Sequence, residues 1–242
     1  MAHFYFLDAS EPLVAGATVV LTGDEGRHAA TVSRLRVGES VRVGDGLGTI
    51  AVGTVTGATK DTLNVQISQV DVLARELPQL TLIQALAKTD RDERAVEMST
   101  ELGIDVVIPW LADRSVSRWD SAKAEKGRLR WESIAREASK QSIRAHLPLV
   151  HSVATTKDIC SQFGPGELIV LDPTGDVSLS DVVLRKENIA MVVGPEGGLS
   201  PAELELFAAA GAQIATLGRN VLRTSTAGPA ALAVLNSRLG RL

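Results

Sequence analysis

The chain has 242 residues, of which 45% are hydrophobic and 3% aromatic, and its formal net charge is −4. That length and apolar content suit one large domain or two modest ones with a mostly aliphatic core. A single cysteine, Cys160, excludes an intrachain disulfide framework and a thiolate metal site, and the four histidines lack metal-ligand spacing. Because the sequence has no apolar run long enough to span a membrane and no signal-peptide pattern, we expect a cytoplasmic protein that binds no membrane and no metal.

Residues 1–75 have the pattern of a small β-rich domain. Short apolar stretches are separated by turn signals such as Gly44-Asp45-Gly46, and residues 49–55 and 63–70 are rich in β-branched side chains that partly alternate with polar ones. This pattern predicts a small barrel or sandwich. Residues 71–79 read as a linker, and we place the second domain at residues 76–242.

After the linker, apolar runs alternate with helical segments. We expect strands at residues 80–87, 105–109, 168–171, 189–193 and 214–217, and helices at residues 91–102, 121–143, 201–210 and 225–239. Asp90 with Glu93, and Ser200 with Glu203, have the spacing of capping boxes at two of these helices. Alternating strands and helices predict a mostly parallel sheet with helices on both faces, and the rhythm alone suggests an ordinary doubly wound sheet.

Positive charge gathers in one segment of this acidic chain. Nine basic residues and four acidic ones lie between Arg114 and Arg144. Lys126, Arg130, Glu137, Lys140 and Arg144 fall near one stripe of the helix expected there. Such a stripe is either a solvated face with salt bridges or a surface that binds a polyanion.

The most informative stretch lies between residues 189 and 226, where two apolar runs each lead into an unusual loop. The loops are GPEGG at residues 194–198 and GRNVLRT at residues 218–224. Loops at the carboxyl ends of strands are how open α/β sheets build ligand sites, and glycines let backbone groups approach a ligand closely. Neither loop matches a common phosphate-binding pattern, and Glu196 would repel a phosphate. The loops therefore suit a neutral or cationic ligand better.

These loops carry a resemblance to a known family. GPEGG followed by S-x-x-E, and then LG-x-x-VLR-T, is similar to the SPOUT superfamily of S-adenosylmethionine-dependent RNA methyltransferases, and most similar to the 16S ribosomal RNA uracil-N3 methyltransferase family. The match spans nearly the whole chain, through Lys88-x-x-Arg91, Glu101-Leu102-Gly103, W-x-x-I-x-x-E-A-x-x-Q-S-x-R at residues 131–144, and His28 with RLRVG at residues 34–38. The chain departs from the family at Ser225, where Glu is usual, and at Gly228-Pro229, which interrupts the expected start of the last helix.

The resemblance implies an α/β C-terminal domain whose mostly parallel sheet is tied in a trefoil knot, and a small N-terminal PUA-like β-barrel that binds RNA. It implies methylation of N3 of a specific uridine in 16S rRNA, within the small ribosomal subunit, by a homodimer. Leu232, Leu235 and Leu239 could supply an apolar seam for that dimer or belong to the chain's own core.

By the same resemblance, the knot holds S-adenosylmethionine. The residues implied to bind this donor are Leu171, Gly194, Glu196, Gly197, Gly198, Leu217, Gly218, Asn220, Val221, Leu222 and Thr224. We expect Arg223, held partly buried by the apolar pair before it, to orient uracil and stabilise the charge that develops on its oxygens. Glu196 is a candidate to face the sulfonium or to act as the base, with solvent as the alternative proton acceptor. Thr224 is more typical of a cap for the last helix.

Several basic and polar residues are candidates to line an RNA cleft, although each could be an ordinary surface residue. They are His28, Arg34, Arg36, Lys88, Arg91, Arg114, Arg136, Gln141 and Arg144. Three other functions remain open: a nucleotide-dependent α/β enzyme, a noncatalytic RNA-binding module with a degenerate donor pocket, and a SPOUT methyltransferase that acts on another RNA. The missing phosphate motifs count against the first, and the intact loops count against the second.

Overall fold

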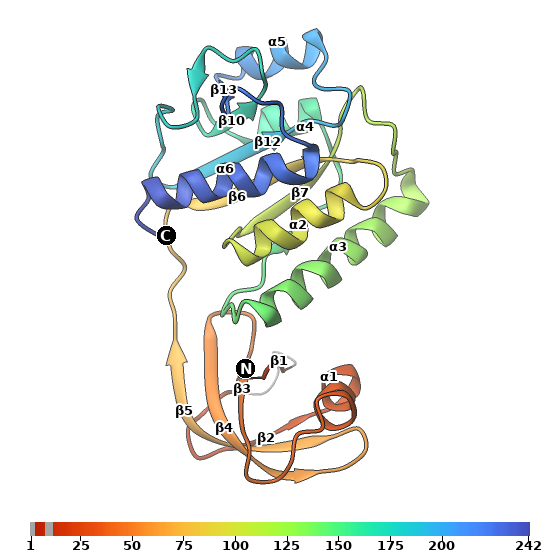
Figure 1. Ribbon diagram of the computed structural model, residues 1–242, viewed down its shortest axis with the longest axis vertical. Helices are drawn as coiled ribbons and strands as arrows, with labels where there is room; N and C mark the ends of the chain where they lie inside the picture. The colour runs from red at the N-terminus through yellow and green to blue at the C-terminus, as the bar shows by residue number, and fades with distance from the viewer. Residues whose placement is uncertain (1–2, 8–11) are drawn as a thin grey trace. The chain divides into compact units, whose positions relative to one another are not determined.

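The computed structural model describes residues 3–7 and 12–242, which divide into two compact units (Figure 1). The first unit holds the chain up to Arg75 together with Ser139–Leu147, and the second holds Glu76–Ala138 and Pro148–Leu242. The first unit is therefore discontinuous in sequence. In the part of the chain that the structure describes, no helix is both long and apolar enough to cross a membrane.

A five-stranded sheet in the order β1-β3-β4-β5-β2 forms the first unit. Its elements are β1 (Phe4–Phe6), β2 (Thr18–Leu21), α1 (Gly23–Arg27), the π-helix η1 (His28–Val32), β3 (Ser40–Gly44), β4 (Thr49–Ala58) and β5 (Leu63–Val72). Buried aliphatic side chains such as Leu21, Val43 and Val65 fill its core. The strands expected at residues 49–55 and 63–70 are confirmed, but β5 runs into the expected linker because Val72 pairs with Thr49.

The segment Ser139–Leu147 is tied into the first unit by several contacts. Lys140 Nζ lies 3.2 Å from Glu25 Oε2, and the Lys140 side chain is only 7% exposed. The backbone amide of Leu147 donates to the Gly46 carbonyl at 2.9 Å. The expectation that Lys140 belongs to an exposed basic stripe is therefore wrong, because this lysine is buried as the partner of a carboxylate.

An eight-stranded sheet organises the second unit, in the order β11-β13-β10-β12-β6-β7-β8, with β9 also paired to β7. The strands are β6 (Gln79–Ala85), β7 (Val106–Leu111), β8 (Leu149–Val150), β9 (Ala154–Thr155), β10 (Leu168–Leu171), β11 (Val177–Ser178), β12 (Asn188–Val193) and β13 (Gln213–Thr216). Each strand pairing recorded in this sheet is parallel. The mostly parallel sheet predicted from the sequence is confirmed.

Five helices accompany this sheet in the described residues: α2 (Arg91–Glu101), α3 (Ser121–Gln141), α4 (Thr156–Gln162), α5 (Pro201–Ala209) and α6 (Thr224–Arg238). One apolar cluster joins α2, α3 and α6 to side chains such as Leu82 and Met191. A second cluster joins α4 and α5 to Ile83 and Val192. Because neighbouring residues of a strand point to opposite faces, helices cover both faces of the sheet, as expected. Leu232 and Leu235 are fully buried in the first cluster, so the alternative that they form a dimer seam is wrong.

Of the two capping boxes expected from the sequence, the structure contains one. Ser200 and Glu203 form the predicted capping box at α5. Asp90 does not cap α2, because it adopts a left-handed backbone conformation with φ of 58° and its carboxylate pairs with Arg94 at 3.1 Å. The buried Asp92 instead accepts a hydrogen bond from the Ala87 amide at 2.9 Å, and burial raises the pKa of this carboxyl.

The Gly228-Pro229 pair does not interrupt α6, contrary to the expectation from the family pattern. The helix runs from Thr224 to Arg238 with the proline inside it. A Cβ on Gly228 would lie 3.0 Å from Leu82 Cδ1. The glycine thus allows α6 to approach β6 closely.

Candidate active site

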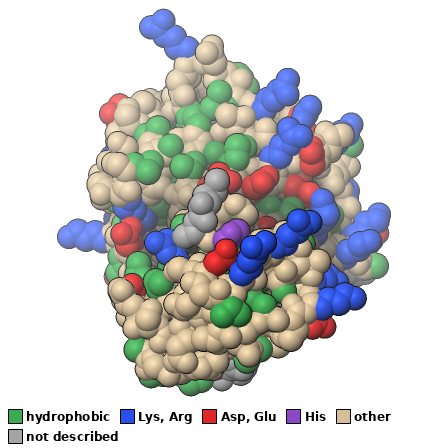
Figure 2. Space-filling model, turned by 60° about the horizontal axis from the view of Figure 1, so that its bottom comes forward, with side chains coloured by type: hydrophobic (Ala, Val, Ile, Leu, Met, Phe, Trp, Pro, Cys, Tyr) green, Lys and Arg blue, Asp and Glu red, His purple; other side chains and the backbone are tan. Residues whose placement is uncertain are grey.

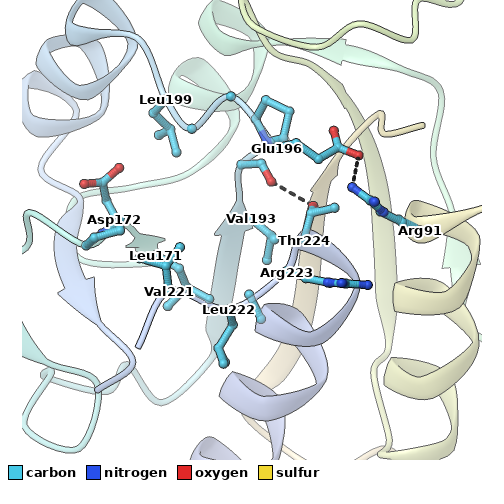
Figure 3. Close-up of a pocket in the computed structure, with 16 residues that line it drawn as sticks. Arg91, Leu171, Asp172, Val193, Glu196, Leu199, Val221, Leu222, Arg223 and Thr224 are labelled. Carbon is cyan, nitrogen blue, oxygen red and sulfur yellow. Dashed lines mark hydrogen bonds and ion pairs between the residues drawn. The ribbon is translucent and has the colours of Figure 1, made fainter. Parts of the chain in front are cut away.

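A cavity of about 490 Å³ opens where β10 and β12 end and α6 begins (Figure 3). Its walls are Arg91, Leu171, Asp172, Pro173, Val193, Gly194, Pro195, Glu196, Gly197, Gly198, Leu199, Val221, Leu222, Arg223, Thr224 and Ala227. The two loops singled out in the sequence therefore meet at one cavity, although they are separated by α5 and β13. Its volume is typical of a small-molecule site.

The turn at residues 194–198 enters the cavity directly from β12. Thr224 Oγ1 donates to the Gly194 carbonyl at 2.8 Å and accepts a hydrogen bond from the buried Gln84 Nε2, also at 2.8 Å. The expectation that Thr224 caps α6 is wrong, because the N-cap residue is Arg223 and no side chain caps this helix. The threonine hydroxyl instead connects the start of α6 to the turn.

Glu196 is held by groups outside its own turn. Arg91 Nη1 donates to Glu196 Oε1 at 3.0 Å, and the Lys88 amide donates to the same oxygen at 3.3 Å. Arg114 Nη1 donates to the neighbouring Gly197 carbonyl at 3.0 Å. In Figure 3, Arg91 reaches across from the start of α2 to Glu196. One carboxylate oxygen is thus engaged by protein donors.

Glycine is favoured at Gly194 and Gly198 of this turn for two different reasons. Gly198 has a φ of +69°, a left-handed conformation that side chains rarely adopt. A Cβ on Gly194 would lie only 2.6 Å from Leu199 Cδ1. A side chain at Gly194 would therefore force Leu199 to move, and one at Gly198 would strain the backbone.

The second loop reaches the cavity through its last residues. Val221, Leu222 and Arg223 line it. Gly218 and Asn220, which lie earlier in the loop, and Leu217, which precedes it, are not among the walls. Val221 is 77% exposed, and Arg223 is exposed as well. The expectation of a partly buried Arg223 is therefore wrong, because its apolar neighbours do not cover it.

Sequence reasoning missed several residues of the cavity, of which Asp172 is the one with a charge. It is 8% exposed, and its Oδ1 accepts hydrogen bonds from the amide and hydroxyl of Thr174 at 2.9 and 2.6 Å. A signal was present, since Asp172 directly follows the expected strand 168–171. Pro173, Val193, Pro195, Leu199 and Ala227 were also missed, and their apolar side chains carry no distinctive signal.

The residues expected to contact RNA are divided between the two units. His28, Arg34, Arg36, Gln141 and Arg144 belong to the first unit, and Lys88, Arg91, Arg114 and Arg136 belong to the second. Arg130, from the expected stripe, pairs with Glu93. Figure 2 shows Lys and Arg side chains interspersed with Asp and Glu on the face in view. Among residues 3–7 and 12–242, no group of three or more His, Cys, Asp or Glu side chains could hold a metal ion.

Comparison with known proteins decides the family. A model described as an RNA methyltransferase domain matches residues 75–236, and a model described as an RNA methyltransferase PUA domain matches residues 21–68. The chain belongs to the RNA methyltransferase family. The resemblance inferred from the two loops is thereby confirmed, and this RNA methyltransferase has a PUA-like match in its first unit.

Two relatives of this RNA methyltransferase match over most of their length. The chain is 38% identical over 232 residues to the ribosomal RNA small subunit methyltransferase E of Mycobacterium bovis, covering 92% of this chain and 88% of the relative. It is 30% identical over 243 residues to the protein of the same name from Bacillus subtilis, covering 96% and 95%. The solved structure of the Neisseria gonorrhoeae ribosomal RNA small subunit methyltransferase E bound to S-adenosylmethionine is 29% identical, with a TM-score of 0.89 and 98% of each chain covered.

Proposed function

We propose that this protein transfers the methyl group of S-adenosylmethionine to N3 of a specific uridine in 16S rRNA. The observation that carries the proposal is the single cavity at which the GPEGG turn and the VLRT segment meet. Relatives named for methylation of small-subunit ribosomal RNA, and a similar structure bound to S-adenosylmethionine, support it.

The cavity suits the donor in size and chemistry. Its volume of about 490 Å³ lies within the range of pockets for ligands of drug size, and glycine backbone and apolar side chains dominate its wall. We propose that backbone groups of the two loops, with Leu171 and Leu222, hold the adenine and methionine parts. Leu217, Gly218 and Asn220 would then set the path of the second loop without lining the cavity. The donor supplies an electrophilic methyl group on a cationic sulfur.

The site must then orient uracil, let the N3 proton leave and stabilise charge on the uracil oxygens. Arg223 lines the cavity and is exposed, so its guanidinium is accessible to a substrate base. We assign it the role of donating to the uracil carbonyl region. Glu196 Oε1 already accepts two hydrogen bonds, which favours solvent over Glu196 as the proton acceptor.

We propose that the PUA-like unit is a β-barrel and that it recognises RNA. The residues we assign to RNA recognition are His28, Arg34, Arg36, Lys88, Arg136, Gln141 and Arg144. From the resemblance to the SPOUT superfamily we also propose a trefoil knot in the second unit, a homodimer, action within the small ribosomal subunit and a cytoplasmic location. Leu232 and Leu235 take no part in that dimer, since they are buried in the core.

Methylation assays on purified small subunits and on free 16S rRNA test the function directly. Ribosomal RNA from a strain lacking the gene supplies the unmodified substrate, and mass mapping of digested RNA locates the new methyl group. We expect one N3-methyluridine that requires both protein and donor. Donor binding without transfer to any RNA would favour the noncatalytic module, and transfer only to another RNA would favour a different substrate.

A further inference from the structure

The turn at residues 194–198, here called the donor turn, is held in place by side chains from distant parts of the chain. Thr224 holds its first residue. Arg91, the first residue of α2, holds Glu196, and Arg114, which follows β7, holds the carbonyl of Gly197. Two of the arginines that the sequence offered as RNA contacts thus meet at consecutive residues of one turn.

Each arginine directs its Nη1 group at a protein acceptor. The Arg91 and Glu196 side chains are 37% and 28% exposed, so the ion pair is neither fully solvated nor fully buried. Arg114 is exposed, yet its Nη1 donates to a backbone carbonyl rather than to solvent. A phosphate that used the same donors would have to displace Glu196 or the Gly197 carbonyl, leaving these acceptors without their present partners.

The donor turn needs such anchors because of its composition. Gly197 and Gly198 lose more conformational freedom on ordering than any other residue type would. A turn ordered before the ligand arrives lowers the entropic cost of binding. Arg91 holds Glu196, just before these glycines, and Arg114 holds the carbonyl of Gly197. Removing either arginine should therefore raise the entropic cost of ordering the turn around the donor.

We propose that Arg91 and Arg114 are positioning residues for the methyl donor, acting through Glu196 and the Gly197 carbonyl, and are not contacts to RNA phosphate. The inference rests on the proposed function, since it takes the cavity to be the S-adenosylmethionine site. It reverses the sequence-based expectation for two residues and leaves Lys88, Arg136 and the first-unit residues as the RNA candidates.

The chain offers a matched control for each arginine. Arg94 lies on the same helix as Arg91, is exposed and pairs with Asp90. Arg118 lies in the same connection as Arg114, is exposed and donates to the Asp113 carbonyl. Neither control residue lines the cavity. We therefore compare Arg91→Ala with Arg94→Ala, and Arg114→Ala with Arg118→Ala. Both variants of each pair lose one positive charge, so a difference between them does not come from charge alone.

The test is calorimetric titration with S-adenosylmethionine in the absence of RNA, combined with filter binding of 16S rRNA transcripts over a salt series. We expect Arg91→Ala and Arg114→Ala each to weaken donor binding about 5–20-fold, as loss of a hydrogen bond from a charged group would. Arg91→Lys should recover part of the loss because it restores the charge but not the guanidinium geometry. The double variant of Arg91→Ala with Glu196→Gln should lose less than the sum of the two single losses.

The salt series separates the two roles. RNA affinity of Arg91→Ala and Arg114→Ala should follow the same dependence on salt as their matched controls. If either arginine is a phosphate contact, the logarithmic salt slope falls by roughly 0.7–0.9 relative to its control while donor affinity is unchanged, and the proposal is overturned. Thermal melting identifies any variant that does not fold. If Arg91→Ala does not fold, the donor affinity and the salt slope of Arg91→Lys and Arg91→Gln decide between the two roles. If the unaltered protein binds no S-adenosylmethionine, the proposed function itself fails, which is a different result from equal affinity in all variants.

Discussion

The hydroxyl of Thr224 bridges Gln84 and Gly194, accepting from the first and donating to the second, each at 2.8 Å. Three segments distant in sequence, the end of β6, the donor turn and the start of α6, are thereby connected through one oxygen atom. Gln84 is fully buried and Thr224 is 5% exposed, so water does not readily replace either bond.

Replacing Thr224 with Val should destabilise the protein and weaken donor binding. The change keeps the shape of the side chain but removes the hydroxyl that bonds to both the Gly194 carbonyl and Gln84, whose Nε2 keeps its bond to the Ala85 carbonyl at 3.1 Å. Loss of a partner costs about 1–3 kcal/mol for a buried polar group. Thr224→Ser, which keeps the hydroxyl, is the matched control. Denaturant unfolding and calorimetry with S-adenosylmethionine measure the two effects, and equal behaviour of Val and Ser variants would refute the bridge.

Gly198→Ala should weaken donor binding by straining the donor turn. Its φ of +69° costs an alanine roughly 1–2 kcal/mol. Asn tolerates this conformation better than Ala does, so Gly198→Asn should bind the donor more tightly than Gly198→Ala. Apart from the glycine and its two chain neighbours, no atom of the described residues lies within 4 Å of the Cβ position, so a steric clash does not confuse the comparison. An alanine variant with unchanged affinity would contradict the idea that the donor needs this backbone path.

Arg223→Ala and Arg223→Lys should both slow methyl transfer while leaving donor affinity nearly unchanged. A guanidinium can donate two hydrogen bonds in a fixed fork, which lysine does not copy, and removing one preorganised donor typically costs on the order of 10²–10³ in rate. Single-turnover transfer of labelled methyl to ribosomal RNA measures the rate. A lysine variant as fast as the unaltered protein would exclude the bidentate role, and a parallel loss of donor affinity would assign Arg223 to the donor pocket.

The pH dependence of unfolding should report on Asp45. Burial raises the pKa of this carboxyl, but hydrogen bonds from Thr49 and Leu47 outweigh burial and leave the pKa below its ordinary value of 3.8. A lowered folded-state pKa stabilises the protein above pH 3.8, and this stabilisation is lost as pH falls through the folded value. The difference in unfolding free energy between the unaltered protein and Asp45→Asn should therefore be largest near neutral pH and shrink in acid. A difference that grows in acid would reverse the assigned sign.

The sequence predicted those features that depend on local pattern. The β-branched runs and the Ser200–Glu203 capping box appear where expected, because side-chain periodicity and capping act within a few residues. The meeting of the two loops at one cavity also followed from the rule that strands of a parallel sheet share an edge. The short strands β8, β9 and β11 were missed, since two residues carry no periodic signal.

Features set by distant contacts could not be read from the sequence. Asp90 has the right spacing for a capping box, but its left-handed backbone and its pairing with Arg94 override that signal. Arg91 was expected to line an RNA cleft and Lys140 to lie on a basic helical stripe, yet one holds Glu196 and the other is buried against Glu25. Nothing in the local sequence identifies these partners, which lie more than a hundred residues away.

The return of Ser139–Leu147 to the first unit affects the order in which the protein can mature during synthesis. The ribosome must translate through Leu147 before the amide of that residue can reach Gly46, or Lys140 can neutralise Glu25. By then β6, α2 and β7 of the other unit have already been made. The N-terminal five strands therefore emerge first but are completed late, and a fragment ending at Arg75 would expose the surface that this returning segment normally covers.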